Sequence, residues 1–451
     1  MVEQANQSQS SNQAIADKMT AYLQACLANR YLMGSVLVAR AGEVLLSAGY
    51  GMANLEHDVP NTPQTKFRLG SITKQFTATA ILQLQEQGLL EVHDSISTYL
   101  PDYPNGKQIT IHHLLNHTSG IPNFNQLDGF EQTTKIKVTL DDLIARFSHE
   151  PLEFTPGERY RYTNSGYMVL TKIIEIVSGY SYADYLQHQI LEPLGMLDSG
   201  YDRQEAILPH RASGYIFTGE AYQNADFVDM SWPSGAGGMY STIEDLYKWE
   251  QGLYTDAILS ESSREMMFTP KVTIREAEDG KGYYHGYGGI ICTHYDRKLL
   301  YHGGGIDGFS TRIARYPDEQ VSIIVLTNIN APAVPAPVVL IANALAAILF
   351  GEPYELPKGR QAIELDPAIY DAYVGQYELD PDWLMTVTKE SDRIFTQWAG
   401  EERVEIFPES STKFFMKVMD AQHTFVLDET GKVSHVIVHQ GGRERVATRV
   451  N

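Results

Sequence analysis

The stretch Phe67-Arg-Leu-Gly-Ser71-Ile-Thr-Lys74-Gln-Phe76 places a hydroxyl and an amine three residues apart at the start of a predicted helix. Apolar residues recur at helical spacing as far as Leu84, and Gly88 supplies a C-terminal stop. Side chains three apart share one helix face, so Ser71 and Lys74 lie within reach of each other. Burial at a helix start lowers the pKa of a lysine, so the pattern predicts a neutral Lys74 that takes the proton of Ser71.

A second motif is Tyr162-Thr-Asn164, which follows the turn Pro156-Gly157 and precedes a predicted helix over 167–177 that Gly179 ends. A phenol at this place can pass a proton to a leaving group if nearby cations lower its pKa, and the amide can hold a substrate carbonyl. Taken alone, the motif also fits a packed tyrosine beside a capping asparagine.

A third motif, His302-Gly303-Gly304-Gly305, ends a predicted strand. The missing side chains would let a substrate backbone lie against the sheet edge. Alone, the motif fits a glycine-rich turn equally well. The order of the three motifs along one chain makes them a more specific sign of catalysis than any one motif alone.

In that order, the motifs resemble those of the serine β-lactamase and penicillin-binding-protein superfamily, in particular its class C β-lactamase-like branch. Further segments that look like landmarks of the superfamily are Leu114-Leu-Asn-His-Thr-Ser-Gly120, Tyr162-Thr-Asn-Ser-Gly-Tyr167, Pro193-Leu-Gly-Met196 and Gly237-Gly-Met-Tyr-Ser-Thr242. The resemblance extends over roughly residues 15–350.

The resemblance implies a role for each motif residue. Ser71 would be the acylated nucleophile, Lys74 its base and Tyr162 the partner in proton transfer. Asn164, His302, Gly303 and Gly304 would bind the substrate, and the backbone N–H groups of Ser71 and Gly305 would form the oxyanion hole. Water would release the acyl-enzyme, and neither a cofactor nor a metal is implied.

His302 departs from the lysine that β-lactamases carry at this place. Histidine near neutral pH is mostly uncharged, whereas lysine is a permanent cation suited to a β-lactam carboxylate. We therefore expect a serine hydrolase of small peptides, amides or esters, resembling a D-amino-acid peptidase, a carboxypeptidase or a carboxylesterase. The alternatives are a β-lactamase and a penicillin-binding or penicillin-sensing protein with slow turnover.

The expected fold is of the α/β (α+β) class: a β-lactamase-like antiparallel sheet flanked by helices, a helical subdomain over about 90–270, and a small all-β C-terminal domain. An N-terminal hairpin is predicted from Gly34 to Arg40 and Glu43 to Tyr50, and late strands are predicted at Gly286 to Thr293, Leu299 to Gly303, Phe309 to Tyr316 and Val321 to Asn328. These strands predict one sheet built from both ends of the catalytic domain, 12–350. Residues 351–366 read as a linker. Short alternating runs in 367–451 predict an antiparallel β-barrel or sandwich.

Two rival catalytic designs fit less well. His112, His113 and His117 cluster in sequence, but no glutamate lies between them in the His-Glu-x-x-His manner of a zinc hydrolase. Gly179-Tyr-Ser181-Tyr-Ala183 breaks the Gly-x-Ser-x-Gly pattern of an α/β-hydrolase and follows a helix.

Composition limits the partners. Of the 451 residues, 35 are Lys or Arg and 56 are Asp or Glu, so the net charge of −21 argues against a nucleic-acid partner. The apolar run Pro337 to Phe350 is too short to cross a bilayer, so it is predicted to be a buried core helix. The polar start of the chain lacks a secretory signal pattern, so we expect a soluble protein that is cytoplasmic, or periplasmic or secreted if the chain is a processed form. The partner expected is a small-molecule or short-peptide acyl substrate. Oligomeric state and pairing of Cys26 with Cys292 stay open.

Overall fold

The computed structural model describes residues 2–127, 129–276, 281–330, 337–380, 383–401, 403–418, 421–440 and 443–450. Contacts divide the chain into two compact units. The larger comprises segments 34–214 and 225–328, and the other comprises segments 1–33, 215–224 and 329–451. The segment 351–366 contains no helix or strand. The domain boundaries inferred from the sequence stay a prediction.

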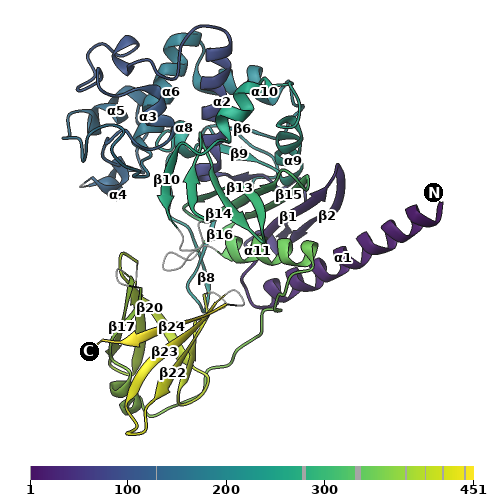
Figure 1. The fold of residues 1–451 in the computed structure, drawn as a ribbon, viewed down its shortest axis with the longest axis vertical. Coiled ribbons are helices and arrows are strands. Elements are labelled where there is room, and N and C mark those ends of the chain that lie inside the picture. Colours follow the sequence, from purple (N-terminus) through teal and green to yellow (C-terminus); the bar gives the residue numbers. More distant parts are fainter. Residues whose placement is uncertain are drawn as a thin grey trace. The chain divides into compact units, whose positions relative to one another are not determined.

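An eight-stranded antiparallel sheet organises the larger unit, in the order β10-β11-β12-β13-β14-β15-β1-β2. Its strands are β1 (Gly34–Arg40), β2 (Glu43–Tyr50), β10 (Val272–Arg275), β11 (Tyr283–His285), β12 (Ile290–His294), β13 (Arg297–Ile306), β14 (Phe309–Tyr316) and β15 (Val321–Thr327). Figure 1 shows the purple strands β1 and β2 beside the green β15. The predicted joining of early and late strands in one sheet is confirmed.

Local sequence explains the turns of this sheet. Ala41 and Gly42 both adopt positive φ angles, of 50° and 83°, as a tight hairpin between β1 and β2 requires. One expected strand, Gly286 to Thr293, was wrong in its first half. Gly286 to Gly289 instead form a turn in which Gly288 has a φ of 74°, because this glycine-rich run reverses the chain between β11 and β12.

The larger unit also contains several α-helices, which loops connect. They are α2 (Thr73–Glu86), α3 (Ile111–Leu115), α4 (Phe130–Thr133), α5 (Leu140–Ser148), α6 (Ser165–Ser178), α7 (Tyr182–Leu186), α8 (Ser234–Gly237), α9 (Ile243–Gly252) and α10 (Glu261–Met267). Within 90–270, where the sequence predicts a helical subdomain, helices alternate with loops and short strands. Of the short strands, β9 (Met239–Ser241) pairs with both β6 (Gly200–Tyr201) and β5 (Phe67–Arg68), which lies just before the serine motif.

The second unit contains two α-helices, a three-stranded sheet and a barrel. Helix α1 (Val2–Ala28) packs against α11 (Pro337–Phe350) and buries Met19, Leu23 and Cys26, which recur at helical spacing. Strands β7 (Tyr215–Phe217), β8 (Tyr222–Asn224) and β16 (Ile329–Asn330) form a three-stranded sheet. Among the described residues, no helix combines the length and apolar character needed to span a bilayer.

The C-terminal strands close into a barrel, which decides between the barrel and the sandwich expected from the sequence. The strands are β17 (Gly375–Asp380), β18 (Trp383–Glu390), β19 (Arg393–Trp398), β20 (Val404–Pro408), β21 (Lys413–Phe415), β22 (Ala421–Leu427), β23 (Val433–Gln440) and β24 (Arg443–Arg449). Pairing of β17 with β24 closes the barrel. Its core is aromatic, with the rings of Tyr373 and Phe425 stacked 4.5 Å apart.

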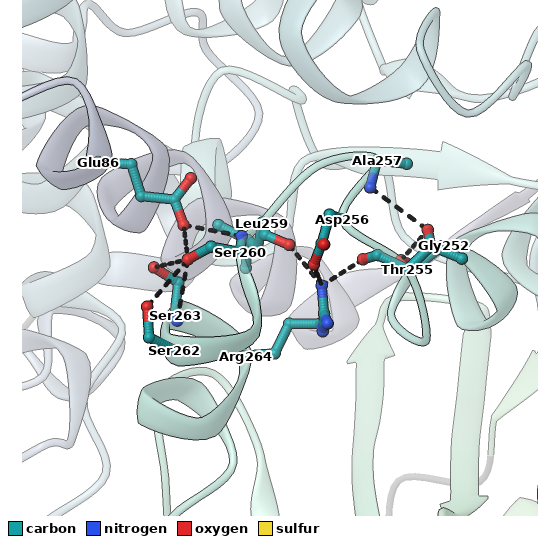
Figure 2. Close-up of polar contacts among 10 residues, drawn as sticks. All are labelled: Glu86, Gly252, Thr255, Asp256, Ala257, Leu259, Ser260, Ser262, Ser263 and Arg264. Carbon is teal, nitrogen blue, oxygen red and sulfur yellow. Dashed lines mark hydrogen bonds and ion pairs between the residues drawn. The ribbon is translucent and has the colours of Figure 1, made fainter.

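A polar cluster anchors the far end of α2 to the segment that leads into α10 (Figure 2). Glu86 accepts hydrogen bonds from the backbone N–H and the hydroxyl of Ser260, at 2.9 and 2.6 Å. Arg264 on α10 donates to the carbonyl oxygens of Thr255 and Leu259 and forms a 2.7 Å ion pair with Asp256. The bonds between Glu86 and Ser260 hold the C-terminal end of the helix that begins beside Ser71, and those of Arg264 hold the segment that leads into α10.

Arg264→Met is expected to destabilise the protein by about 1–2 kcal/mol, because two carbonyl groups lose a donor at a side chain that is only 16% exposed. Arg203→Met is the matched control, since the Arg203 side chain is 52% exposed and has a 3.5 Å ion pair; its effect should stay within about 0.5 kcal/mol. Urea unfolding of both variants measures the difference. Equal midpoints would contradict this role for Arg264.

Candidate active site

Ser71 lies in a single turn of 3₁₀-helix, Gly70–Ile72, that runs directly into α2. Gly70 has a φ of 55°, in the left-handed region that favours glycine. A Cβ atom at Gly70 would lie 2.8 Å from the backbone nitrogen of Gly305. The serine turn and the end of β13 therefore touch through their backbones.

The glycine run on β13 allows this close approach. A Cβ atom at Gly304 would lie 1.9 Å from the carbonyl oxygen of Leu69 and 2.4 Å from Oγ1 of Thr311. Thr311 donates a 2.7 Å hydrogen bond to the same carbonyl oxygen. By contrast, a Cβ atom at Gly305 would meet no atom within 4 Å. Gly304 thus has a packing role that the sequence did not suggest, while space is open beside Gly305.

Lys74 is fully buried and has three oxygen neighbours. Its Nζ lies 2.7 Å from Oδ1 of Asn164, 2.8 Å from the carbonyl oxygen of Ala236 and 3.1 Å from Oγ of Ser71. Burial lowers the pKa of Lys74 well below its ordinary value. The amide and carbonyl oxygens can only accept, so they take the two N–H groups of a neutral amine and leave its lone pair for the Ser71 proton.

Tyr162 lies beside this pair, with its ring centre 4.9 Å from Nζ of Lys74. Burial raises the pKa of the Tyr162 phenol, although a hydrogen bond with Ser71 acts in the opposite direction. The sequence-based condition that cations lower this pKa is not met, because burial is the largest cause of the shift and raises the pKa. The phenol therefore stays protonated near neutral pH and is a proton donor.

Asn164 immediately precedes α6 and joins the serine helix to a neighbouring loop. Its Oδ1 accepts from Lys74, and its Nδ2 donates a 3.0 Å hydrogen bond to Oδ1 of the exposed Asn125. Its backbone N–H donates to Oδ1 of Asn123 at 3.1 Å. The Nδ2 group can therefore reach a substrate carbonyl by exchanging its bond to Asn125.

His302 on β13 is buried, with 4% exposure. Its Nδ1 lies 2.5 Å from the carbonyl oxygen of Gly303, so Nδ1 carries the proton and Nε2 has a free lone pair. Burial is the main cause that lowers the pKa of His302, to about 3. The group is uncharged at neutral pH, in agreement with the expectation from the sequence.

Sequence reasoning missed three residues that lie beside the candidate catalytic residues. The carbonyl of Ala236 on α8 holds Lys74, and the available signal was the glycine landmark that begins one residue later. Two further buried histidines also lie here: His117 has its ring centre 4.4 Å from that of Tyr162, and His285 lies 6.4 Å from His302. The signal for His117 was its place in the Leu114 to Gly120 landmark.

The histidines considered for zinc are engaged in other bonds. Nδ1 of His112 lies 2.7 Å from the hydroxyl of Tyr287, and its Nε2 lies 3.0 Å from Nδ2 of Asn116. Nδ1 of His117 accepts from the backbone of Thr163. Among the described residues, no group of three or more His, Cys, Asp or Glu side chains is arranged to hold a metal ion.

Comparison with known families agrees with this architecture. The family model described as Beta-lactamase matches residues 13–348, which is most of the chain. The chain therefore belongs to the β-lactamase family. A second family model, described as a domain of unknown function (DUF3471), matches residues 359–448.

Relatives of the chain carry penicillin-binding names. Penicillin-binding protein 4* of Bacillus subtilis is 32% identical over 430 residues, which cover 91% of this chain and 94% of the relative. A solved penicillin-binding protein from Bacillus halodurans has a TM-score of 0.63 and 28% identity, covering 73% of this chain and 98% of that one. An octameric penicillin-binding protein homologue from Pyrococcus abyssi has a TM-score of 0.66 and 26% identity, covering 96% and 99%.

Proposed function

We propose that the protein is a serine hydrolase that forms an acyl-enzyme at Ser71. The observation that carries this proposal is the setting of Lys74, whose buried amine lies between two obligate acceptors and the Ser71 hydroxyl. This arrangement supports a base that is neutral at physiological pH and is aimed at the nucleophile. Membership of the β-lactamase family agrees with it.

In the proposed reaction, Oγ of Ser71 bonds to the substrate carbonyl carbon while its proton moves to Nζ of Lys74. Backbone N–H groups of Ser71 and Gly305 stabilise the negative carbonyl oxygen. Tyr162 gives its proton to the leaving group as the acyl bond breaks, and the ammonium of Lys74 then restores the phenol. This direction of transfer follows from the lowered pKa of Lys74 and the raised pKa of Tyr162. Water repeats the steps on the acyl-enzyme and releases the acid.

The proposed substrates are small peptides, amides or esters without a carboxylate at the His302 position. His302 presents an uncharged ring with a free lone pair at Nε2, which is an acceptor and not a cation. Such a group favours a substrate N–H and gives no ion pair to the carboxylate of a penicillin. Of these substrates, the proposal favours short D-amino-acid peptides over carboxylesters. Asn164 and the glycine run would hold the acyl part.

A second candidate function is that of a penicillin-binding protein. Such a protein is acylated by β-lactams, and water removes the acyl group slowly. The names of the relatives support it, since they extend over nearly the whole chain. It uses the same acyl-enzyme at Ser71 and differs in the rate at which water removes the acyl group.

Turnover of a D-alanyl p-nitroanilide, a p-nitrophenyl ester and benzylpenicillin tests the substrate proposal. We expect the first two to be hydrolysed and the penicillin to turn over slowly. His302→Lys adds a cation, so it should raise the rate of penicillin acylation by roughly tenfold while leaving the uncharged ester less affected. Fastest hydrolysis of penicillin by the wild type, or no change of preference in His302→Lys, would contradict the proposal.

A further inference from the structure

His117 is a buried side chain for which the proposed reaction has no use. It follows the short helix α3, is 0% exposed and has a φ of 61°, a backbone conformation that costs energy for a residue with a Cβ atom. Its Nε2 has no hydrogen-bond partner within the described part of the chain. A strained backbone persists only where the surrounding structure holds it, so its contacts are informative.

Two hydrogen bonds join His117 to the residues that flank Tyr162 in the sequence. The carbonyl oxygen of His117 accepts a 2.9 Å hydrogen bond from the backbone N–H of Arg161. Nδ1 of the His117 ring accepts a 3.3 Å hydrogen bond from the backbone N–H of Thr163. One residue therefore holds a backbone N–H group on each side of Tyr162, that of Arg161 and that of Thr163. Because Nδ1 accepts, the single proton of the neutral ring is on Nε2.

The ring of His117 also contacts the phenol ring directly. Its centre lies 4.4 Å from that of Tyr162, with 33° between the planes, and 5.2 Å from that of Tyr167. Tyr160 and His285 lie edge-on to it, at 6.0 and 4.7 Å. Packing on all these faces leaves the ring one orientation, in which the Nδ1 lone pair points at Thr163.

We propose that His117 is a positioning residue that sets the orientation of Tyr162 for proton transfer, through its two backbone-directed bonds and its stacked ring. This inference rests on the proposed function, since it concerns the phenol that would serve the leaving group. His117 does not contact the reacting atoms. It acts by holding the 161–163 segment, so that the phenol faces Ser71 and Lys74. A displacement of about 1 Å at such a group is enough to lower a rate by roughly 10²-fold.

Two substitutions distinguish the contribution of the His117 ring from that of its Nδ1 acceptor. His117→Phe keeps an aromatic ring but lacks the acceptor and disfavours positive φ. His117→Asn keeps an oxygen near the Nδ1 position and tolerates positive φ, but lacks the ring. With phenyl butyrate as the substrate, we expect kcat to fall roughly 10- to 100-fold in His117→Phe and less in His117→Asn, with KM changed less than about threefold. Phenol is a poorer leaving group than p-nitrophenol, so the proton from Tyr162 matters more.

A double-mutant cycle with Tyr162→Phe decides whether His117 acts through the phenol. Tyr162→Phe alone should lower kcat, and in that background the two His117 substitutions should change kcat less than about twofold. Equal losses in both backgrounds would overturn the positioning role while leaving the proposed function intact. An unchanged kcat in Tyr162→Phe alone would contradict the proposed function at Tyr162 and remove the positioning role with it. If His117→Phe does not fold, His117→Asn carries the same cycle.

Discussion

Lys74→Met is expected to lower kcat/KM for a p-nitrophenyl ester by roughly 10³-fold, because the substitution removes the amine that lies 3.1 Å from the Ser71 hydroxyl and would take its proton. Methionine fills a similar volume and takes a costly amine out of the interior, so the variant should fold at least as well as the wild type. Steady-state kinetics and thermal unfolding check both parts of the expectation.

Lys172→Met is the matched control, because Lys172 lies on α6 and pairs with Asp141 at 2.7 Å, outside the candidate site. It should keep the wild-type rate. A Lys74→Met enzyme with more than about a tenth of the wild-type kcat/KM would show that another group takes the serine proton.

The pH profile provides a second readout of the same base. The neutral amine is the active form, so activity should be lost as the pH falls through the pKa of Lys74. Because burial lowers this pKa, the midpoint should lie well below the ordinary value of 10.5. A lowered lysine pKa also means that the unfolded chain binds the extra proton more readily, so stability should rise with pH between the folded and unfolded pKa values. A midpoint at the ordinary lysine value would contradict the buried, neutral base.

Gly304→Ala is expected to disrupt the junction between β13 and the serine turn. Its new methyl group would lie 1.9 Å from the carbonyl oxygen of Leu69, which is backbone and cannot rotate away as a side chain can. We expect a loss of about 2–3 kcal/mol in the free energy of unfolding from overpacking. A shift of the serine turn should also lower kcat by roughly 10²-fold.

Gly289→Ala is the control for this substitution. A Cβ atom at Gly289 would make ordinary contacts, at 3.6 Å to the carbonyl oxygen of Tyr301 and 3.7 Å to Gln75. Its stability should change by less than about 1 kcal/mol. Similar losses in the two glycine variants would show that the close approach of β13 to Leu69 is not what Gly304 provides.

Much of the fold could be predicted from the sequence, because its local patterns agree with the tertiary structure. The hairpin of β1 and β2, the strand β14 and the helix α11 occupy the predicted residues. The αL glycine Gly179 ends α6 where the sequence placed the stop. The turn at Gly286 to Gly289 was missed because alternating apolar residues surround a glycine run that reverses the chain.

Residue types indicated the candidate site, but three-dimensional packing set its electrostatics. Ser71, Lys74, Tyr162 and Asn164 come together as expected. The sequence could not give the direction of the Tyr162 pKa, because that depends on whether burial or a neighbouring cation prevails. Nor could it reveal the carbonyl of Ala236 or the bonds of His117, since main-chain acceptors and stacked rings leave no motif of their own.

Intact-mass spectrometry of the wild type and Ser71→Ala, after exposure to a p-nitrophenyl ester and separately to benzylpenicillin, tests the central claim most directly. The account predicts an acyl mass increment or catalytic turnover in the wild type that is absent in Ser71→Ala, with Ser310→Ala, a buried serine on β14, behaving as the wild type. The same increment or turnover in Ser71→Ala would contradict an acyl-enzyme at Ser71.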